Sequence, residues 1–144
     1  MPLYVTPEDE AREREIADAL EKAYRCELVK LGKKGKVDYL AVRGGRVVAV
    51  FEIKARQDKS VTFDTLWIET AKVAFLDAAA HFFDVPGFFV ARWGDGVIKL
   101  IDAGRVDAVS GEPEWVDRTR NPRGDANDRD EVYLCPIDQM RGVK

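Results

Sequence analysis

The chain has few of the residues that several common kinds of catalytic site require. Its 144 residues include one histidine, His81, and two cysteines, Cys26 and Cys135, which lie far apart in no metal-ligand spacing. A single histidine excludes a metal site built from several histidines and argues against a serine–histidine–aspartate triad, so we expect His81 to be structural. We expect the cysteines to be buried, reduced thiols, which favours a reducing compartment such as the cytoplasm.

Long apolar runs and an excess of positive charge are also absent. No apolar run approaches the ~20 residues of a membrane span, and the acidic start of the chain, residues 1–10, lacks the apolar segment of a signal peptide. We therefore expect no membrane association and no signal peptide. The formal net charge is -3, so any contact with nucleic acid must depend on a local cluster of Lys and Arg.

The residues that are present indicate one globular domain spanning 1–144. The chain is 46% hydrophobic and 34% charged, and no repeat or linker divides it. The patterns predict helices at 7–24 and 64–83, and strands at 26–31, 37–43, 46–54, 87–93, 96–102 and 131–137. We expect a long charged loop at 110–130, with one short strand near Trp115, and a frayed tail after 137. This order predicts an α/β fold with a central mixed sheet flanked by helices.

The second predicted helix carries a broad apolar face. We expect this face to cover the sheet and to place Trp67 in the core, because apolar residues recur at helical spacing. The face consists of Leu66, Trp67, Ala71, Ala74, Phe75, Ala78 and Phe82.

Three charged residues occur at one end of a predicted β-hairpin that is otherwise apolar. The segment 36–56 reads KVDYLAVRGGRVVAVFEIKAR and contains Asp38, Glu52 and Lys54. Side chains alternate between the faces of a strand, so Glu52 and Lys54 share one face. Whether Asp38 joins them depends on the pairing register of the hairpin.

The loop at Gly44 and Gly45 decides that register. A two-residue loop at these glycines would pair Arg43 with Arg46 and place Asp38 on the wrong face. We therefore predict a three-residue loop, 43–45, or a bulge that restores the parity. Either arrangement brings two carboxylates together at one strand end.

Two converging carboxylates indicate a divalent metal site. Like charges repel, and a divalent cation removes that repulsion. Mg²⁺ is commonly held by one or two carboxylates together with waters and phosphate oxygens, and a bound metal lowers the pKa of water and stabilises charge on a phosphoryl group. We therefore predict Mg²⁺ or Mn²⁺ at Asp38 and Glu52, with Lys54 orienting water or neutralising charge. The alternative is a weak Glu-x-Lys ion pair on an exposed strand.

The Asp, the glycine turn and the segment FEIK, 51–54, resemble the core of the PD-(D/E)xK nuclease superfamily. Val37 stands where the eponymous motif has proline, a position that varies in the superfamily. The predicted order over about 7–102 is similar to its restriction-endonuclease-like core, helix, three strands, helix, strand, with extra C-terminal strands here. The resemblance implies a metal-dependent endonuclease that hydrolyses DNA, including branched or structured DNA. It also implies that Asp38, Glu52 and the carbonyl of Ile53 hold the metal.

The resemblance adds one candidate catalytic residue from each helix. Glu13, in the segment EREI, is similar to a Glu in the first helix of archaeal Holliday-junction resolvases, and Glu15 is the reserve. Lys72 matches a Lys or Gln that the family often supplies from its second helix. Solvated helix-surface residues are the alternative for both positions.

Basic residues flank the predicted site on both sides. We expect Lys30, Lys33, Lys34, Lys36, Arg56 and Lys59 to contact the DNA backbone, and an ordinary solvated surface is the alternative. Arg118, Arg120 and Arg123 would fold over the substrate. Trp67, Trp93 and Trp115 are candidates for base stacking, although Trp67 is better explained as core.

Other functional hypotheses remain open. The Arg- and Asp-rich segment before the last strand resembles small phage-encoded members of the superfamily, so the expected setting is the cytoplasm of a bacterial, archaeal or phage-infected cell. The main alternative is a catalytically inactive nuclease-fold protein that binds nucleic acid or serves assembly in a phage or mobile element. An unrelated small α/β interaction domain is a third. A homodimer with paired sites would suit an enzyme that cuts two strands.

Overall fold

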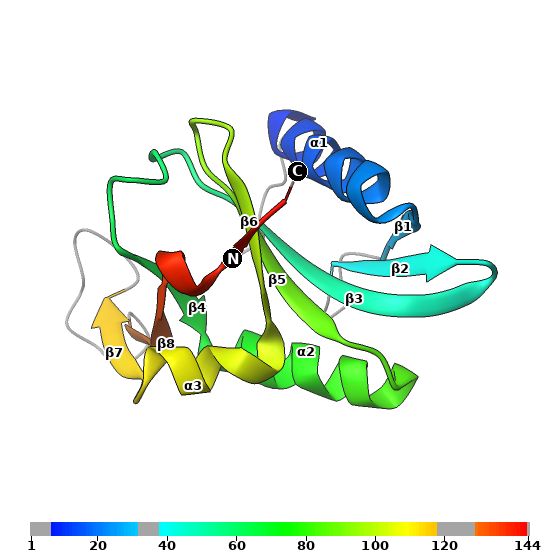
Figure 1. Ribbon diagram of the computed structural model, residues 1–144. Coiled ribbons are helices and arrows are strands. Elements are labelled where there is room, and N and C mark those ends of the chain that lie inside the picture. The colour runs from blue at the N-terminus through cyan, green and yellow to red at the C-terminus, as the bar shows by residue number, and fades with distance from the viewer. Residues whose placement is uncertain (1–6, 32–37, 118–128, 144) are drawn as a thin grey trace.

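The fold is built on a six-stranded mixed sheet. The structure is a computed structural model that describes residues 7–31, 38–117 and 129–143. The strand order is β1-β2-β3-β5-β6-β9, and only the β3–β5 pairing is parallel. The sheet lies between helices α1 (Pro7–Tyr24) and α2 (Thr70–Phe83), as Figure 1 shows. Its strands are β1 (Glu27–Lys30), β2 (Tyr39–Arg43), β3 (Arg46–Ala55), β5 (Gly87–Arg92), β6 (Ile98–Asp102) and β9 (Arg141–Gly142).

The two helices cover opposite faces of this sheet. Ile16 and Leu20 of α1 pack in one cluster with Phe51 and Ile53 of β3. Val50 of β3 packs in a second cluster with residues of α2. Because side chains alternate along a strand, Glu52 and Lys54 point to the α2 face. The order of helix, three strands, helix and strand is the core that the sequence predicts.

A second, three-stranded sheet was not predicted. It has the order β4-β8-β7 and consists of β4 (Thr65–Glu69), β8 (Arg129–Pro136) and β7 (Glu114–Asp117). The prediction of a helix from 64 is therefore wrong over residues 65–69. Leu66 and Ile68 are buried while Trp67 is 44% exposed, so this segment alternates with period two. Its pairing with β8 overrides the apparent helical spacing.

The predicted apolar face of the second helix is also wrong. All five of its helical members are exposed: Ala71, Ala74, Phe75, Ala78 and Phe82. The buried residues of α2 are Val73, Leu76 and Ala80. The helix begins at Thr70. A helical repeat counted from Leu66 therefore selected the solvent-exposed side of α2 and not its buried side. His81 is exposed in the last turn of α2.

The C-terminal part is more ordered than predicted. A 3-10 helix, η1 (Ala103–Arg105), and a short helix, α3 (Val106–Ser110), follow β6, and the short strand expected near Trp115 is β7. The prediction of a frayed tail is wrong, because η3 (Ile137–Gln139) precedes β9, which pairs with β6. Ile137 and Met140 anchor this segment in the core.

Two further expectations can be compared with the described residues. Both cysteines are free; Cys135 is buried and Cys26 is half-buried. Across 7–31, 38–117 and 129–143, no helix has the length and apolar character needed to cross a membrane.

Candidate active site

The hairpin of β2 and β3 reaches the required register through a bulge. Arg43 pairs with Arg46, so the loop is the two residues Gly44 and Gly45, and the predicted three-residue loop is wrong. Both glycines have positive φ, 59° and 75°, as a tight turn of this kind requires. The alternative, a bulge, is confirmed: the register shifts between Ala41 and Val42, and Val48 is left without a partner.

The bulge places the two carboxylates opposite each other. Tyr39 pairs with Phe51, and extending this register by one residue sets Asp38 across from Glu52 on the α2 face. Asp38 is held there because its Oδ2 accepts a hydrogen bond of 2.8 Å from the backbone N–H of Ile53. Glu52, with 6% exposure, is the one buried charged residue among those described.

The main-chain carbonyl of Ile53 points to the same edge of β3 as its N–H. In a strand, the N–H and C=O of one residue face the same neighbour. The N–H of Ile53 donates to Asp38, and the pairing of β2 with β3 ends at Tyr39. The carbonyl therefore faces the Asp38 side, where the resemblance predicts a metal ligand.

Two lysines accompany the carboxylates. Lys72 Nζ lies 3.0 Å from Glu52 Oε1, so the second helix reaches the site as predicted. Burial tends to lower the pKa of Lys72, but the Glu52 carboxylate outweighs it and the pKa is raised. Lys54 lies on the same face as Glu52, and its Nζ donates over 3.4 Å to the carbonyl of Trp67. Burial, assisted by Lys72 and Arg56, lowers the pKa of Lys54 to about 8.

The carboxylates are costly in their ionised form. Burial raises the pKa of Asp38, and the nearby Glu13 adds to this while the Ile53 N–H opposes it. Burial also raises the pKa of Glu52, and the Asp38 charge adds to it. A cation placed between these two groups would offset both effects.

The donor set fits a hard divalent cation. No group of three or more His, Cys, Asp or Glu side chains able to hold a metal exists in the described part of the chain. Two carboxylates and one carbonyl are nevertheless a typical set of protein ligands for Mg²⁺. Waters and phosphate oxygens fill the remaining coordination positions of this ion. The residues present therefore fit Mg²⁺ better than a metal that needs a complete protein cage.

The two candidates in α1 lie in different surroundings. Glu13 Oε2 is 3.0 Å from Lys30 Nζ, and its charge reaches Asp38, whose pKa it raises. Glu15 Oε1 is 3.2 Å from Arg92, a residue of β5. Glu13 is thus the one that lies near the carboxylates, while its catalytic role remains a prediction.

The predicted DNA-binding residues are only partly within the described chain. Lys33, Lys34 and Lys36 lie outside the described residues, as do Arg118, Arg120 and Arg123. Lys30 pairs with Glu13, Lys59 is exposed, and Arg56 donates over 3.5 Å to the carbonyl of Trp67. Trp93 is 1% exposed and belongs to the core, so it is not available for base stacking.

Glu69 is a site residue that the sequence did not reveal. Its charge acts on both lysines: it helps to raise the pKa of Lys72 and opposes the lowering at Lys54. Thr65, Trp67 and Glu69 alternate with buried residues along β4 and share one face. The period-two pattern TLWIE was the available signal, and the helix assignment concealed it.

Comparison with known proteins supports this fold. A family model described as "Phage putative PDDEXK endonuclease" matches residues 1–143, in agreement with the predicted superfamily. A similar solved structure is Hjc, a Holliday junction resolvase from the archaeal hyperthermophile Archaeoglobus fulgidus, with a TM-score of 0.60 and 14% identity over 93% of this chain and 90% of that chain. That likeness supports the restriction-endonuclease-like fold alone. No curated protein matches the chain.

Proposed function

The chain belongs to this family of phage PDDEXK endonucleases, and from that premise we propose that it hydrolyses DNA phosphodiester bonds with the help of a divalent metal ion. One observation carries the proposal: the bulged hairpin brings Asp38 and Glu52 face to face at the end of a buried strand, with Lys54 on the same side. Buried titratable groups with shifted pKa values and specific charge partners are typical of functional sites.

Each residue of the site has a proposed role. Asp38, Glu52 and the carbonyl of Ile53 would hold Mg²⁺ or Mn²⁺, which supplies an activated water and charge stabilisation at phosphorus when bound. Lys54, whose pKa lies near 8, exchanges a proton readily near neutral pH and can orient the attacking water. Lys72 favours the ionised form of Glu52, against the effect of burial and Asp38 on its pKa, and positions it through their 3.0 Å ion pair.

Glu13 and the cationic side chains complete the proposed site. Glu13 would orient water or metal from α1, because its charge already acts on Asp38. Lys54, Lys72 and Arg56 are cationic side chains that lie close together beside the carboxylates of Glu52 and Glu69. With a divalent cation bound at the carboxylates, these side chains would attract a phosphate group even though the protein as a whole is acidic.

A cleavage assay tests the proposal. Wild type, Asp38→Asn and Lys54→Ala are incubated with duplex, single-stranded and four-way DNA in Mg²⁺, in Mn²⁺ and in EDTA. We expect cleavage by the wild type with metal, and losses of about 100-fold or more in both variants. Glu112→Gln and Lys22→Ala change exposed residues away from the site and serve as matched controls that keep full activity.

The outcomes separate the hypotheses. Equal cleavage by wild type and Asp38→Asn would overturn the site assignment. Binding without cleavage of any substrate would favour a catalytically inactive nuclease-fold protein that binds nucleic acid.

A preference for branched DNA and a homodimer with paired sites remain parts of the proposal, as does action in the cytoplasm of the host cell. Dimerisation would let two sites act on two strands. Light scattering on the purified protein, with and without four-way DNA, measures the assembly directly. A monomer under both conditions would contradict the paired-site arrangement.

A further inference from the structure

A cavity of about 320 Å³ lies beside the candidate site. It is formed by the loop that follows β3, by β4 and by Trp93, and its lining residues are Arg56, Asp58, Phe63, Thr65, Leu66, Trp67 and Trp93. Leu66 and Trp93 are buried, whereas Phe63 is 62% exposed and Trp67 is 44% exposed. The cavity therefore has an apolar interior and two aromatic side chains open to solvent. We call it the aromatic cavity.

The aromatic cavity adjoins the proposed catalytic lysine. Lys54 Nζ lies 3.4 Å and Arg56 Nη2 lies 3.5 Å from the carbonyl oxygen of Trp67. Trp67 also shares a face of β4 with Glu69, whose charge acts on Lys54. A nucleotide whose phosphate lies at Lys54 would therefore have its base within reach of this cavity.

The loop that forms one wall is fixed by hydrogen bonds to the main sheet. Arg56 N–H donates to the carbonyl of Arg92 at 2.7 Å, and Gly94 N–H donates to the carbonyl of Asp58 at 2.8 Å. Asp95 Oδ2 accepts from the N–H and the hydroxyl of Ser60 at 3.1 and 2.8 Å. A cavity with fixed walls loses little conformational entropy when it binds a ligand.

Gly94 shows how closely this loop is held. A Cβ at residue 94 would lie 2.2 Å from the carbonyl oxygen of Gln57, so only glycine fits there. The wall of the aromatic cavity is thus part of the packed structure.

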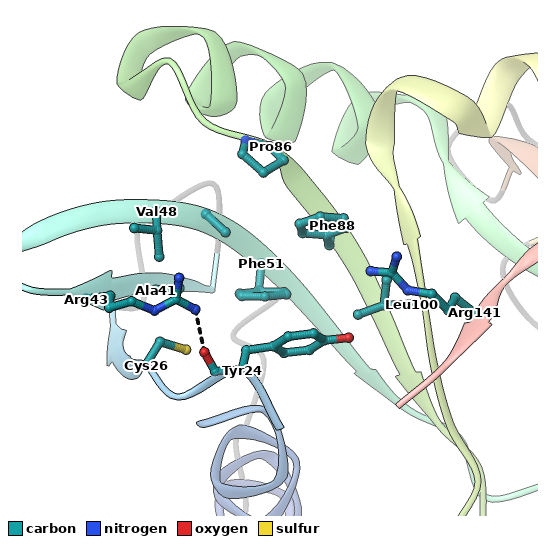
Figure 2. A pocket seen from close by; sticks show the side chains of 11 residues that line it. Tyr24, Cys26, Ala41, Arg43, Val48, Phe51, Pro86, Phe88, Leu100 and Arg141 are labelled. Atoms are coloured by element: carbon teal, nitrogen blue, oxygen red, sulfur yellow. Dashed lines mark hydrogen bonds between the residues drawn. The ribbon is translucent and has the colours of Figure 1, made fainter. Parts of the chain in front are cut away.

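The other cavity on the sheet has a different character. Figure 2 shows this cavity, of about 230 Å³, where the end of α1 meets the sheet. Apolar side chains such as Phe51, Phe88 and Leu100 dominate its walls, and they belong to the face opposite Glu52. It has no connection to the candidate site, and nothing in the structure identifies an occupant.

We propose that the aromatic cavity binds one unpaired nucleobase next to the phosphate that is cleaved. This inference rests on the proposed nuclease function and specifies its substrate class: DNA that offers an unstacked base at the site, such as a single strand, a flap or a branch point. Aromatic side chains stack on any base, and such stacking is sequence-tolerant. Arg56 supplies the charge for an adjoining phosphate. The volume is at the lower end of the ~300–1,000 Å³ typical of small-ligand sites.

A binding experiment isolates the contribution of the base. Two labelled single-stranded oligonucleotides of equal length, one of thymidine and one entirely abasic, carry the same phosphates. Their affinities are measured by fluorescence anisotropy in EDTA, which prevents metal-dependent cleavage. We expect the wild type to bind the thymidine strand about 5- to 100-fold more tightly. Trp67→Ala should remove most of this difference, and Trp67→Phe should keep much of it.

Matched variants control for general effects. Phe82 on α2 is 84% exposed and lies outside the aromatic cavity, so Phe82→Ala should keep the full difference. Equal affinity of the wild type for both strands would overturn the proposal. A difference that survives Trp67→Ala but disappears in Trp115→Ala would also overturn it, because the base would then stack on β7.

A cleavage measurement separates this inference from the proposed function. In Mg²⁺, Trp67→Ala should reduce cleavage of a duplex with unpaired nucleotides more than cleavage of a perfect duplex. Cleavage with no dependence on the base or on Trp67 would overturn the cavity proposal and leave the nuclease intact. Base-dependent binding without cleavage of any substrate would overturn the nuclease proposal and leave the cavity as a nucleobase site.

Discussion

The two ends of β3 place charged side chains for opposite purposes. At the turn end, Arg43 on the paired strand donates to the carbonyls of Tyr24 and Arg25, where α1 ends. At the site end, Glu52 is buried opposite Asp38 and both carboxyl groups have raised pKa values. The first arrangement satisfies carbonyls that the helix leaves open. The second keeps like charges together away from water.

This difference separates stability from function along one strand. A charge at the turn end meets oppositely polarised groups and stabilises the fold. A charge at the site end destabilises the metal-free fold and is retained, on the proposed function, for chemistry. Substitutions at the two ends should therefore have effects of opposite sign on stability.

The largest effect should come from deleting Val42, the β2 residue beside the bulge. Arg43 would still pair with Arg46, but Asp38 would then lie opposite Val50, or opposite Phe51 with the bulge kept, and no longer opposite Glu52. We expect cleavage to fall below detection. Deleting Val48 instead removes only the unpaired residue and keeps every other pair of the hairpin, so this variant should retain activity.

Circular dichroism must show that both of these variants are folded. A folded Val42 deletion variant with full activity would contradict the assigned register. Val48→Ala keeps the bulge and serves as the matched control with normal cleavage.

The next effect concerns Asp38→Asn in the metal-free protein. The substitution removes one of two buried like charges, while the amide oxygen can still accept from Ile53. We expect the variant to be inactive yet to melt roughly 2–4 °C higher than wild type at pH 7.5 in EDTA. Saturating Mg²⁺ should raise the Tm of the wild type and leave the variant nearly unchanged. A lower Tm of the variant in EDTA would show that Asp38 stabilises the fold.

A smaller, pH-dependent effect is expected at Lys54. Its pKa is lowered from 10.5 to about 8, so the folded state binds this proton less tightly than the unfolded state. The neutral side chain therefore contributes stability above pH 10.5, and that contribution is lost as the pH falls through about 8. Lys54→Gln should stabilise the metal-free protein most below pH 8 and progressively less up to pH 10. Urea unfolding at pH 7, 8.5 and 10 measures this trend, and a pH-independent difference would contradict it.

The core of the fold and the convergence of Asp38 with Glu52 could be predicted because their signals are local. Asp38, Glu52 and Lys54 are charged residues in apolar strands, and the glycine turn between them is a strong local signal. Because Asp38 reaches the face of Glu52 only through a bulge or a longer loop, one of these two features was expected. The choice between those two could not be made, because nothing local in the run of valines marks which residue is left unpaired.

Other features depend on contacts between distant segments. Residues 65–69 form a strand because they pair with β8, which lies about 65 residues later in the chain. This strand brings the carbonyl of Trp67 to Lys54 and the charge of Glu69 to both lysines, and neither position could be predicted from a helical pattern. The tail is ordered for the same reason, since Ile137 and Met140 reach a core assembled from earlier elements. Pairing with remote strands overrides local propensity.

The smallest predicted effect lies at the turn end, in Arg43→Ala. The guanidinium donates from Nε to the carbonyl of Arg25 at 3.2 Å and from Nη2 to the carbonyl of Tyr24. Losing these exposed bonds should lower the free energy of unfolding by about 0.5–1.5 kcal/mol and leave cleavage unchanged. Arg43→Lys, which cannot reproduce the two-donor geometry, should give an intermediate value. Urea unfolding measures both variants. A loss of activity at preserved stability would show that the two ends of β3 are coupled, and the separation of stability from function along this strand would then fail.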